Sequence, residues 1–490
     1  MPEPSIFEKS QRGQRGLTFP SSDVPSQGPV FPLDLLRSRP PRLPQVSERS
    51  VVRHITILSK ENFSVDANFY PLGSCTMKYN PRVNEQAAAL ADFTGMHPYQ
   101  FDEDCQGTLE ILWRLQEMLK EITGLPAVSL QPAAGAHGEL TALLVFAAHF
   151  RERGEKRTKV LIPDNAHGTN PASAHIAGFT PVEIKSNAAG LVDLDDLRGK
   201  LDGSVAGMML TNPNTLGLFE TNVAEIARLL HGVGAKLYID GANLNAILGL
   251  TRPGDWGADA MHLNTHKTLA TPHGGGGPGA GPICVAADLE PYLPLPVVER
   301  GRSGRFALKT HGDKSIGRVR GFAGQIGMLL RAYLYLRSLG PAGLRGVAEN
   351  AVLNARYLQH VCAGILESPY NGNSMHEFVL SARRLKAETG IRALDLAKRL
   401  IDHGIHPPTI YFPLVVEEAL MIEPTETERR RTLDEFARVL GEIVAEARTA
   451  PDRLREAPLS TAISRPDEVR AARQPDLRYQ WPAGDRAADD

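Results

Sequence analysis

Two residues of this 490-residue chain, Lys267 and Asp240, together have the types needed for chemistry on an amine. A lysine is rarely buried unless it is paired or functional, and a lysine in a pocket can lose its proton through desolvation and attack an aldehyde. Asp240 ends the stretch AKLYIDGAN and precedes Lys267 by 27 residues. A carboxylate that faces a pyridine nitrogen keeps this nitrogen protonated, so the pair fits the requirements of pyridoxal 5'-phosphate. Taken singly, a surface lysine and a helix-capping or turn aspartate are the alternatives.

Two further motifs fit a phosphate-bearing pyridine ring. In QPAAGAHGELTALL, small residues precede a predicted helix, and helix N-termini bind phosphate through free N–H groups. Gly135, Ala136 and His137 are the predicted cradle, with tight packing of a helix start as the alternative. His167, in PDNAHGTNPASA, could stack on the ring, although a lone histidine there is more often a loop residue.

Two other motifs are rejected. The run GGGGPGAG contains GxGxxG at Gly274, Gly276 and Gly279, but Pro278 and Pro282 oppose a helix start, so we predict no dinucleotide site. The HxxxH pair at 262 and 266 lacks the glutamate of a metalloprotease, so we predict no metal.

The elements that must position these residues alternate between strand and helix. Apolar residues at helical spacing predict a helix over 108–124, and a second helix follows at 139–154. Short apolar runs predict strands at 159–164, 205–214, 235–243 and 259–267. This alternation favours an α/β domain with a mainly parallel sheet, in which polar strand ends gather in one pocket.

We predict four parts along the chain. Residues 1–65 form an extended, proline-rich arm that wraps a partner or the main body, with disorder as the alternative, and 66–340 form the large domain. Residues 341–450 form a smaller C-terminal α/β domain, with helices near 341–363, 391–403 and 426–447, and 451–490 form an irregular tail. A long helix from about residue 322 would link the two domains.

Composition excludes several classes of protein. The chain is 42% hydrophobic and 22% charged, with a formal net charge of −2 and no dense basic run, which argues against nucleic acid. No apolar stretch is long enough for a membrane span, and the N-terminus lacks the apolar centre of a secretory signal. The four cysteines are far apart and form no CxxC pair, which is typical of reduced thiols in a cytoplasmic protein.

Four motifs, in order, resemble the P-protein of the glycine cleavage system. They are ANFYPLGSCTMKYNPR (67–82), SLQPAAGAHGE (129–139), IPDNAHGTNPASA (162–174) and HLNTHKTLATPHGGGGPGAGPI (262–283). The resemblance covers roughly residues 65–450, and the length is about half that of the single-chain form. The chain therefore resembles subunit 2 of the two-subunit form, the half that keeps the cofactor lysine.

The resemblance implies a fold-type-I, aspartate-aminotransferase-like enzyme that depends on pyridoxal 5'-phosphate. Lys267 would hold the cofactor covalently, Asp240 would pair with the ring nitrogen, and His167 would stack. The remaining implied contacts are with the phosphate, from Ala134, Gly135, Ala136, His137 and His266, and with the ring's 3′-oxygen, from Asn212 or Thr211. His137 stands where the family often has glutamine.

The resemblance also implies an activity and partners. The enzyme would be a glycine dehydrogenase (aminomethyl-transferring, decarboxylating), an oxidoreductase that releases CO2 from glycine and passes the aminomethyl group to the lipoyl arm of the H-protein. A homologous subunit 1 would complete an α2β2 heterotetramer. Loops 70–80 and 271–282 would form the channel for the lipoyl arm.

Two alternatives differ in their requirements. Another fold-type-I enzyme, of hydroxymethyltransferase or desulfurase type, would need tetrahydrofolate or cysteine in place of lipoyl protein. A non-catalytic scaffold subunit would have no need of Lys267 and Asp240.

Overall fold

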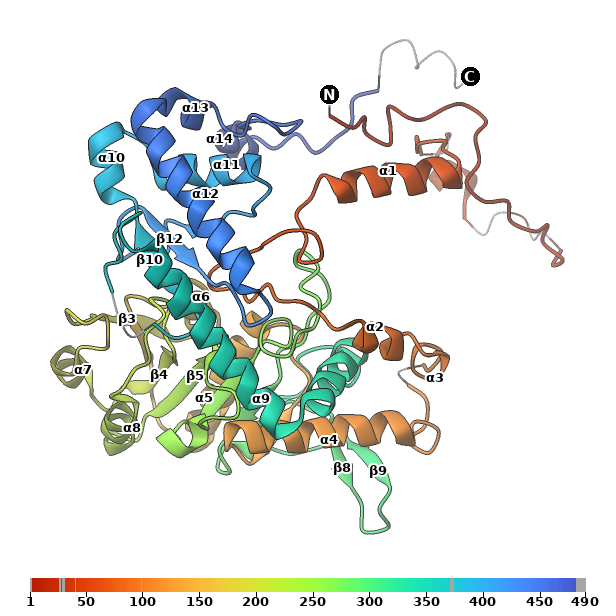
Figure 1. Cartoon of the computed structure of the whole chain (residues 1–490). Helices are drawn as coiled ribbons and strands as arrows, with labels where there is room; N and C mark the ends of the chain where they lie inside the picture. Colours follow the sequence, from red (N-terminus) through yellow and green to blue (C-terminus); the bar gives the residue numbers. More distant parts are fainter. Residues whose placement is uncertain are drawn as a thin grey trace. The chain divides into compact units, whose positions relative to one another are not determined.

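A computed structural model of the chain describes all residues except 1, 26–27, 29–30, 40, 98, 371–373 and 482–490. Two compact units are present: one is Val65–Arg455, and the other joins Met1–Ser64 to Glu456–Asp490 (Figure 1). Among the residues that the structure describes, no helix has the length and apolar character needed to cross a bilayer.

The main sheet of Val65–Arg455 has seven strands in the order β1-β7-β6-β5-β4-β2-β3. Neighbours from β3 to β6 run parallel, whereas β7 is antiparallel to both β1 and β6. The strands are β1 (Ala127–Ser129), β2 (Lys159–Pro163), β3 (Thr180–Ile184), β4 (Val205–Thr211), β5 (Lys236–Gly241), β6 (Ala260–Leu263) and β7 (Ile283–Val285). Every residue of β4 is buried, as expected for a central strand that is covered on both faces.

One helix directly before the first strand and four helices between successive strands flank the sheet in the sequence. They are α4 (Gln106–Thr123), α5 (Gly135–Glu152), α6 (Thr169–Ile176), α7 (Leu194–Lys200) and α8 (Val223–Gly232). In α8 the buried residues are Val223, Ile226, Ala227 and Leu230, one apolar face at helical spacing. α4 ends at Gly124, whose φ of 71° is the left-handed conformation that glycine adopts readily.

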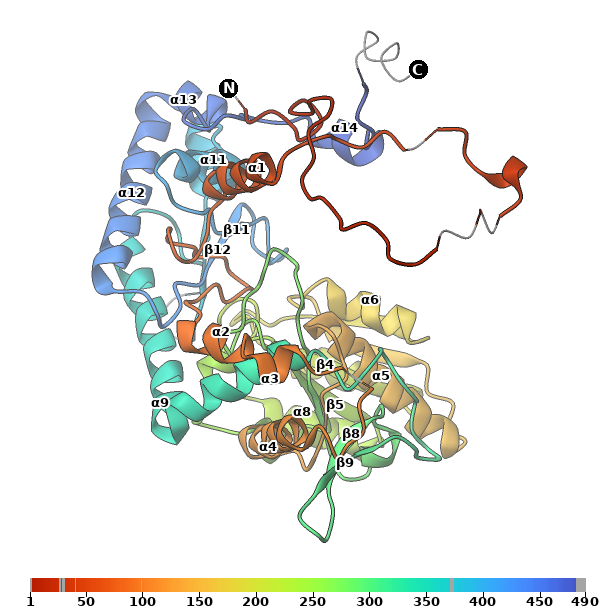
Figure 2. The same ribbon diagram turned by 90° about the vertical axis from the view of Figure 1, so that its right-hand side faces the viewer.

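A second sheet follows the long helix α9 (Ile326–Cys362), which is kinked at Gly340. Its order is β10-β12-β11, and α9 packs against α12 (Figures 1 and 2). The strands are β10 (Phe378–Ser381), β11 (Thr409–Ile410) and β12 (Ala419–Ile422). The helices are α10 (Arg383–Thr389), α11 (Ala393–Asp402), α12 (Arg430–Thr449) and α13 (Pro451–Glu456).

Smaller elements complete this unit. They are α2 (Arg82–Ala88), α3 (Ala91–Thr94), the hairpin of β8 (Val297–Arg300) and β9 (Phe306–Lys309), and the 3-10 turns η2 (Leu244–Ala246), η3 (Pro253–Trp256) and η4 (Glu290–Tyr292).

The other unit contains η1 (Leu33–Leu35), α1 (Glu48–Lys60) and α14 (Glu468–Arg473). The Ser47 hydroxyl caps α1 by accepting the Ser50 N–H at 3.3 Å. Phe7 stacks on Tyr479 with ring centroids 4.8 Å apart, so the two ends of the chain meet within this unit.

The α/β class with a mainly parallel sheet is confirmed. The predicted strand at 205–214 is shorter, because Asn212 and the residues after it turn away from the sheet as β4 ends at Thr211. The four-part division at residues 65, 340 and 450 stays a prediction.

Candidate active site

The polar ends of β4, β5 and β6 meet at a cavity of about 470 Å³. The loop 72–75, which precedes the sheet in the sequence, forms another wall. Most of the predicted site residues line this cavity: Lys267, Asp240, His167, Ala134, Gly135, Ala136 and His266. The sheet topology therefore brings together residues that are more than 100 positions apart, as expected for a pocket beyond parallel strand ends.

Lys267 lies in a turn just after β6 and is 9% exposed. Its backbone N–H donates to the Asn264 carbonyl at 3.1 Å, which fixes the turn. The positive charge of Lys267 contributes to lowering the pKa of His167 and of His266, after the larger effect of burial. Lys267 is thus a buried lysine that lines the cavity, and a lysine amine is a nucleophile that can attack a carbonyl.

Asp240, at the end of β5, is 2% exposed. Its carboxylate accepts the Ala242 N–H at 2.9 Å and the Asn170 side-chain amide at 3.2 Å. Burial raises its pKa, but His262, the Ala242 N–H and Lys267 together lower it further than burial raises it. Asp240 is therefore held as an anion inside the cavity.

Glu139 is a site residue that the sequence reasoning missed. It lies on α5, lines the cavity and accepts the Asn170 amide at 3.0 Å, so one amide bridges Glu139 and Asp240. Burial and the charge of Asp240 raise the pKa of Glu139 to about 8. Near neutral pH Glu139 keeps its proton while Asp240 carries the charge. The only sequence signal was the position of Glu139, one turn after the predicted cradle.

The start of α5 has no side-chain cap, and Ala134, Gly135 and Ala136 at this start line the cavity. A Cβ atom on Gly135 would lie 2.0 Å from the Asn264 Oδ1 atom, so only glycine fits there. An uncapped helix start with room for close approach is a phosphate-binding arrangement.

His137 does not line the cavity, because its Nδ1 atom accepts the Ala133 N–H at 3.1 Å. Burial lowers its pKa, and so does the charge of Arg320. The Nε and Nη1 atoms of Arg320 are buried and have no hydrogen-bond partner among the described residues. This guanidinium, which the sequence analysis did not select, is an orphaned donor group near the helix start.

His167 is at the edge of the cavity, with its ring edge-on to Phe412 at 5.7 Å between centroids. Its Nδ1 atom is 2.9 Å from the Thr169 hydroxyl. His266 also lines the cavity, and burial followed by the charge of Lys267 lowers its pKa to about 3, so this ring is neutral.

Asn212 is turned away from the cavity: its side chain accepts the Glu220 N–H at 2.9 Å and donates to the Glu220 carbonyl at 3.4 Å. Thr211 does line the cavity, and its buried hydroxyl lacks a hydrogen-bond partner within the described part of the chain. Of the two predicted partners for the ring's 3′-oxygen, Thr211 has the better position.

The two predicted channel loops reach the same cavity. Leu72, Gly73, Ser74 and Cys75 line it from one loop, and His273 lines it from the other. Burial raises the pKa of the Cys75 thiol. The glycine-rich run lies between β6 and β7, so it does not join a strand to a helix, in agreement with the rejection of a dinucleotide motif.

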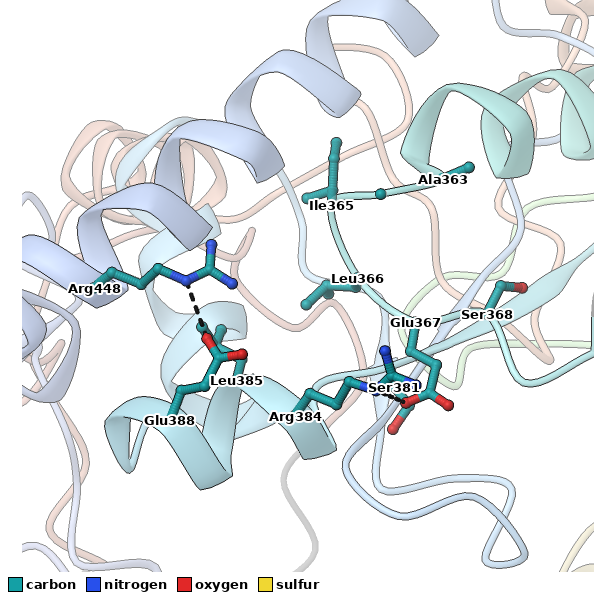
Figure 3. Close-up of a pocket in the computed structure, with 11 residues that line it drawn as sticks. Ala363, Ile365, Leu366, Glu367, Ser368, Ser381, Arg384, Leu385, Glu388 and Arg448 are labelled. Atoms are coloured by element: carbon teal, nitrogen blue, oxygen red, sulfur yellow. Dashed lines mark hydrogen bonds and ion pairs between the residues drawn. The ribbon is translucent and has the colours of Figure 1, made fainter.

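A second cavity, of about 370 Å³, lies between the end of α9, α10 and α12 (Figure 3). Its charged residues pair with one another: Arg448 binds Glu388 at 3.1 Å, and Arg384 binds Glu367 at 3.2 Å (Figure 3). It has no counterpart of the buried lysine and aspartate.

The residues of the first cavity fit pyridoxal 5'-phosphate. A buried lysine, a buried aspartate anion and an uncapped helix start line the cavity and match the aldehyde, ring nitrogen and phosphate of that molecule. The guanidinium of Arg320, whose Nε and Nη1 atoms lack a hydrogen-bond partner among the described residues, does not line the cavity but acts on His137 at that helix start. The orphaned hydroxyl of Thr211 matches a ring oxygen.

Two family models match the chain. Residues 137–276 match aminotransferase class-V, and residues 347–461 match the C-terminal domain of glycine dehydrogenase. Among solved structures, a glycine decarboxylase (P-protein) of the glycine cleavage system, in inhibitor-bound form, superposes with a TM-score of 0.72 at 24% identity, over 84% of this chain and 93% of that one. A sphingosine-1-phosphate lyase from Burkholderia pseudomallei superposes with a TM-score of 0.59 at 16% identity, over 85% of this chain and 94% of that one. These likenesses establish the fold-type-I architecture.

Curated relatives match nearly the whole sequence. The probable glycine dehydrogenase (decarboxylating) subunit 2 of Desulforamulus reducens is 55% identical over 97% of this chain and 99% of its own length. The protein of the same name from Rhodopirellula baltica is 55% identical, over 98% of each chain. With this identity over almost its full length, the chain belongs to the family of glycine dehydrogenase (decarboxylating) subunit 2.

Proposed function

We propose that this chain binds pyridoxal 5'-phosphate, decarboxylates glycine and transfers the aminomethyl group to the lipoyl arm of an H-protein. The observation that carries the proposal is a buried Lys267 and a charged Asp240 in one cavity of a chain that is 55% identical to subunit 2 of glycine dehydrogenase. The same relatives support a partner subunit 1, in an α2β2 heterotetramer.

The predicted cofactor-binding residues would have distinct roles. Lys267 would attach the cofactor through its amine, and Asp240 would keep a proton on the ring nitrogen. His167 would cover one face of the ring. The start of α5, with Arg320 and neutral His266 close by, would bind the phosphate. When bound, the cofactor takes up the electron pair that glycine retains as CO2 leaves.

Glu139 would stabilise this arrangement without adding a second charge. Because it keeps its proton, it can donate a hydrogen bond and leaves Asp240 as the anion opposite the ring nitrogen. Loops 70–80 and 271–282 would admit the lipoyl arm, since both contribute to the cavity wall. We also propose a cytoplasmic location, which the four free cysteines support.

The test is release of labelled CO2 from carboxyl-labelled glycine by the chain together with subunit 1, pyridoxal phosphate and lipoylated H-protein. We expect release that requires the lipoyl group and is lost in Lys267→Ala. Turnover that instead requires tetrahydrofolate or cysteine would replace the proposal by the hydroxymethyltransferase or desulfurase type.

A further inference from the structure

Three buried residues form a cluster behind the cavity that the proposed function does not use: His376, Glu377 and Glu423. His376 and Glu377 immediately precede β10, and Glu423 immediately follows β12. Because β10 and β12 are antiparallel and Phe378 pairs with Ile422, the two glutamates come together at the same end of these two strands. Candidate ligand atoms of the three residues lie within 4.8 Å of one another.

The glutamates bind the wall of the cavity. Glu377 accepts the Ser74 N–H at 2.8 Å and the Asn243 side-chain amide at 3.3 Å, and both of these residues line the cavity. Glu423 accepts the Thr76 hydroxyl at 2.6 Å, in the same loop. The carboxylate pair thus lies one residue away from the space in which the proposed reaction occurs.

The pair holds a proton near neutral pH. Glu377 is 0% exposed and Glu423 is 1% exposed. Burial raises the pKa of Glu423 to about 7, and burial with the charge of Glu423 raises the pKa of Glu377 well above its usual range. Burial lowers the pKa of His376 to about 3, so this ring is neutral.

The other charged groups around the pair act in both directions. Lys267 lowers the pKa of both glutamates, whereas Glu426 raises that of Glu423. Glu426 is itself paired with Lys78 at 2.7 Å. The pair in turn raises the pKa of the Cys75 thiol, which lines the cavity, so the pair and the cavity are electrostatically linked.

The proposed reaction releases a proton in one step and takes one up in a later step. Glycine enters as an ammonium carboxylate, and its nitrogen loses a proton before its carboxylate group leaves as CO2. The electron pair left on carbon forms a C–S bond with one lipoyl sulfur, the S–S bond breaks, and the second sulfur leaves with that bond's electron pair and takes one proton. Atoms and charge balance with no net proton exchange: the proton that the glycine nitrogen loses is matched by the proton that the second sulfur takes. A group beside the cavity that holds this proton between the two steps would therefore serve both of them.

We propose that Glu377 and Glu423 store this proton and return it, across the wall formed by Ser74 and Cys75, to the departing lipoyl sulfur. The inference rests on the proposed function. The same three residues also have the types of a cation site, since neither ring nitrogen of His376 has a hydrogen-bond partner among the described residues. A proton is the better occupant, because hydrogen-bond donors already occupy oxygen lone pairs of both carboxylates, which leaves few for a cation, and because burial favours the neutral form of both acids.

Glu377→Gln and Glu423→Gln test the proposal in the full chain assembled with subunit 1 and pyridoxal phosphate. Two readouts separate the steps: the change in the cofactor spectrum on adding glycine, which needs no sulfur, and CO2 release with lipoylated H-protein as a function of pH. We expect the glycine response to stay within about threefold of the original, and kcat to fall by about 100-fold, the usual contribution of a positioned acid or base. In the original assembly kcat should fall above neutral pH, because the glutamate pair loses its proton there. This fall should flatten in the two variants, and Glu423→Asp should recover part of the rate.

Glu418→Gln is the matched control, because Glu418 is a buried carboxylate at the other end of β12 that binds Lys386 and the Ala393 N–H. It should leave kcat and its pH profile unchanged. An unchanged kcat and pH profile in both test variants would overturn the proton store. Loss of the glycine response in both test variants would also overturn it, because this would assign the two glutamates a structural role. A stoichiometric metal in the original assembly that is absent from both variants would overturn it as well. If the unaltered assembly releases no CO2, the proposed function itself fails.

Discussion

At the scale of single residues, the site depends on how two neighbouring acids divide their protons. Asp240 and Glu139 accept hydrogen bonds from the same amide of Asn170, so two negative charges there would repel in a medium of low polarity. The structure resolves this by charging Asp240, which has His262 and Lys267 beside it, and by keeping the proton on Glu139. The anion is thus fixed at the residue that the proposed cofactor requires.

This division makes stability depend on pH. The pKa of Glu139 rises from 4.5 to about 8 on folding, so between these values the folded state binds more protons and the free energy of unfolding falls as pH rises. The loss is at most about 1.4 kcal/mol per pH unit. Glu139→Gln should remove this loss, so that the variant gains stability relative to the original chain between about pH 5 and about pH 8. Urea unfolding of the variant and the original chain, at about pH 5 and about pH 8, measures this difference in the free energy of unfolding. Glu103→Gln, at an exposed site, should show no such gain, and parallel pH profiles for Glu139→Gln and the original would contradict the assignment.

Sequence reasoning found the residues that stand at strand ends and missed those that act through space. Lys267 and Asp240 follow apolar runs, so their place beyond the sheet was predictable. Glu139 had the pattern of an ordinary helix residue, and its partner Asn170 is 31 positions away. Arg320 lies in a loop without periodicity. Asn212, one of the two predicted partners for the ring's 3′-oxygen, has its side chain hydrogen-bonded to Glu220, because the direction of a side chain after a strand depends on the turn that follows.

At the scale of elements, long apolar periods were predictable and short strands were not. The helix predicted over 108–124 is α4, and the predicted strands are β2, β4, β5 and β6. β1 and β7 have three residues each and pair Ala127 with Val285, far apart in the sequence, so no local pattern announces them. Their pairing nevertheless forms one edge of the sheet, and α5 follows β1 directly in the chain.

The kink in α9 gives a prediction at this scale. Gly340 has φ 61° and ψ −179°, a conformation that is essentially restricted to glycine, and a Cβ there would meet no atom within 4 Å. Gly340→Ala should therefore lower the free energy of unfolding by about 1–3 kcal/mol through backbone strain alone. Gly346→Ala, in the same helix and also in open space, should be neutral or stabilise by up to about 1 kcal/mol. Denaturant midpoints compare them, and equal effects of the two substitutions would refute the strain at the kink.

At the scale of the whole molecule, the unit that contains α1 exposes apolar side chains. Val52 and Ile55 are each 58% exposed on that helix. A pair of apolar side chains on a helix is a common part of a protein interface, and relatives are named as one subunit of an enzyme. We therefore expect the arm to contact subunit 1.

The double substitution Val52→Asp with Ile55→Asp should weaken association with subunit 1 at least about tenfold, which corresponds to about 1.4 kcal/mol. Titration monitored by native mass spectrometry measures the dissociation constant. Ser59→Asp adds a charge to the same helix without removing apolar area and should change it little. Undiminished association of the double variant would mean that α1 lies outside the interface.

Lys267 is proposed to hold the cofactor, and a visible absorbance spectrum of the purified chain with subunit 1 and pyridoxal phosphate tests this role. We expect a cofactor band that borohydride converts into an adduct on Lys267, located by peptide mass spectrometry. The Lys267→Ala variant should lack this band. An adduct on another lysine would contradict the role of Lys267. A chain that shows no band under these conditions would contradict cofactor binding altogether and leave the scaffold interpretation.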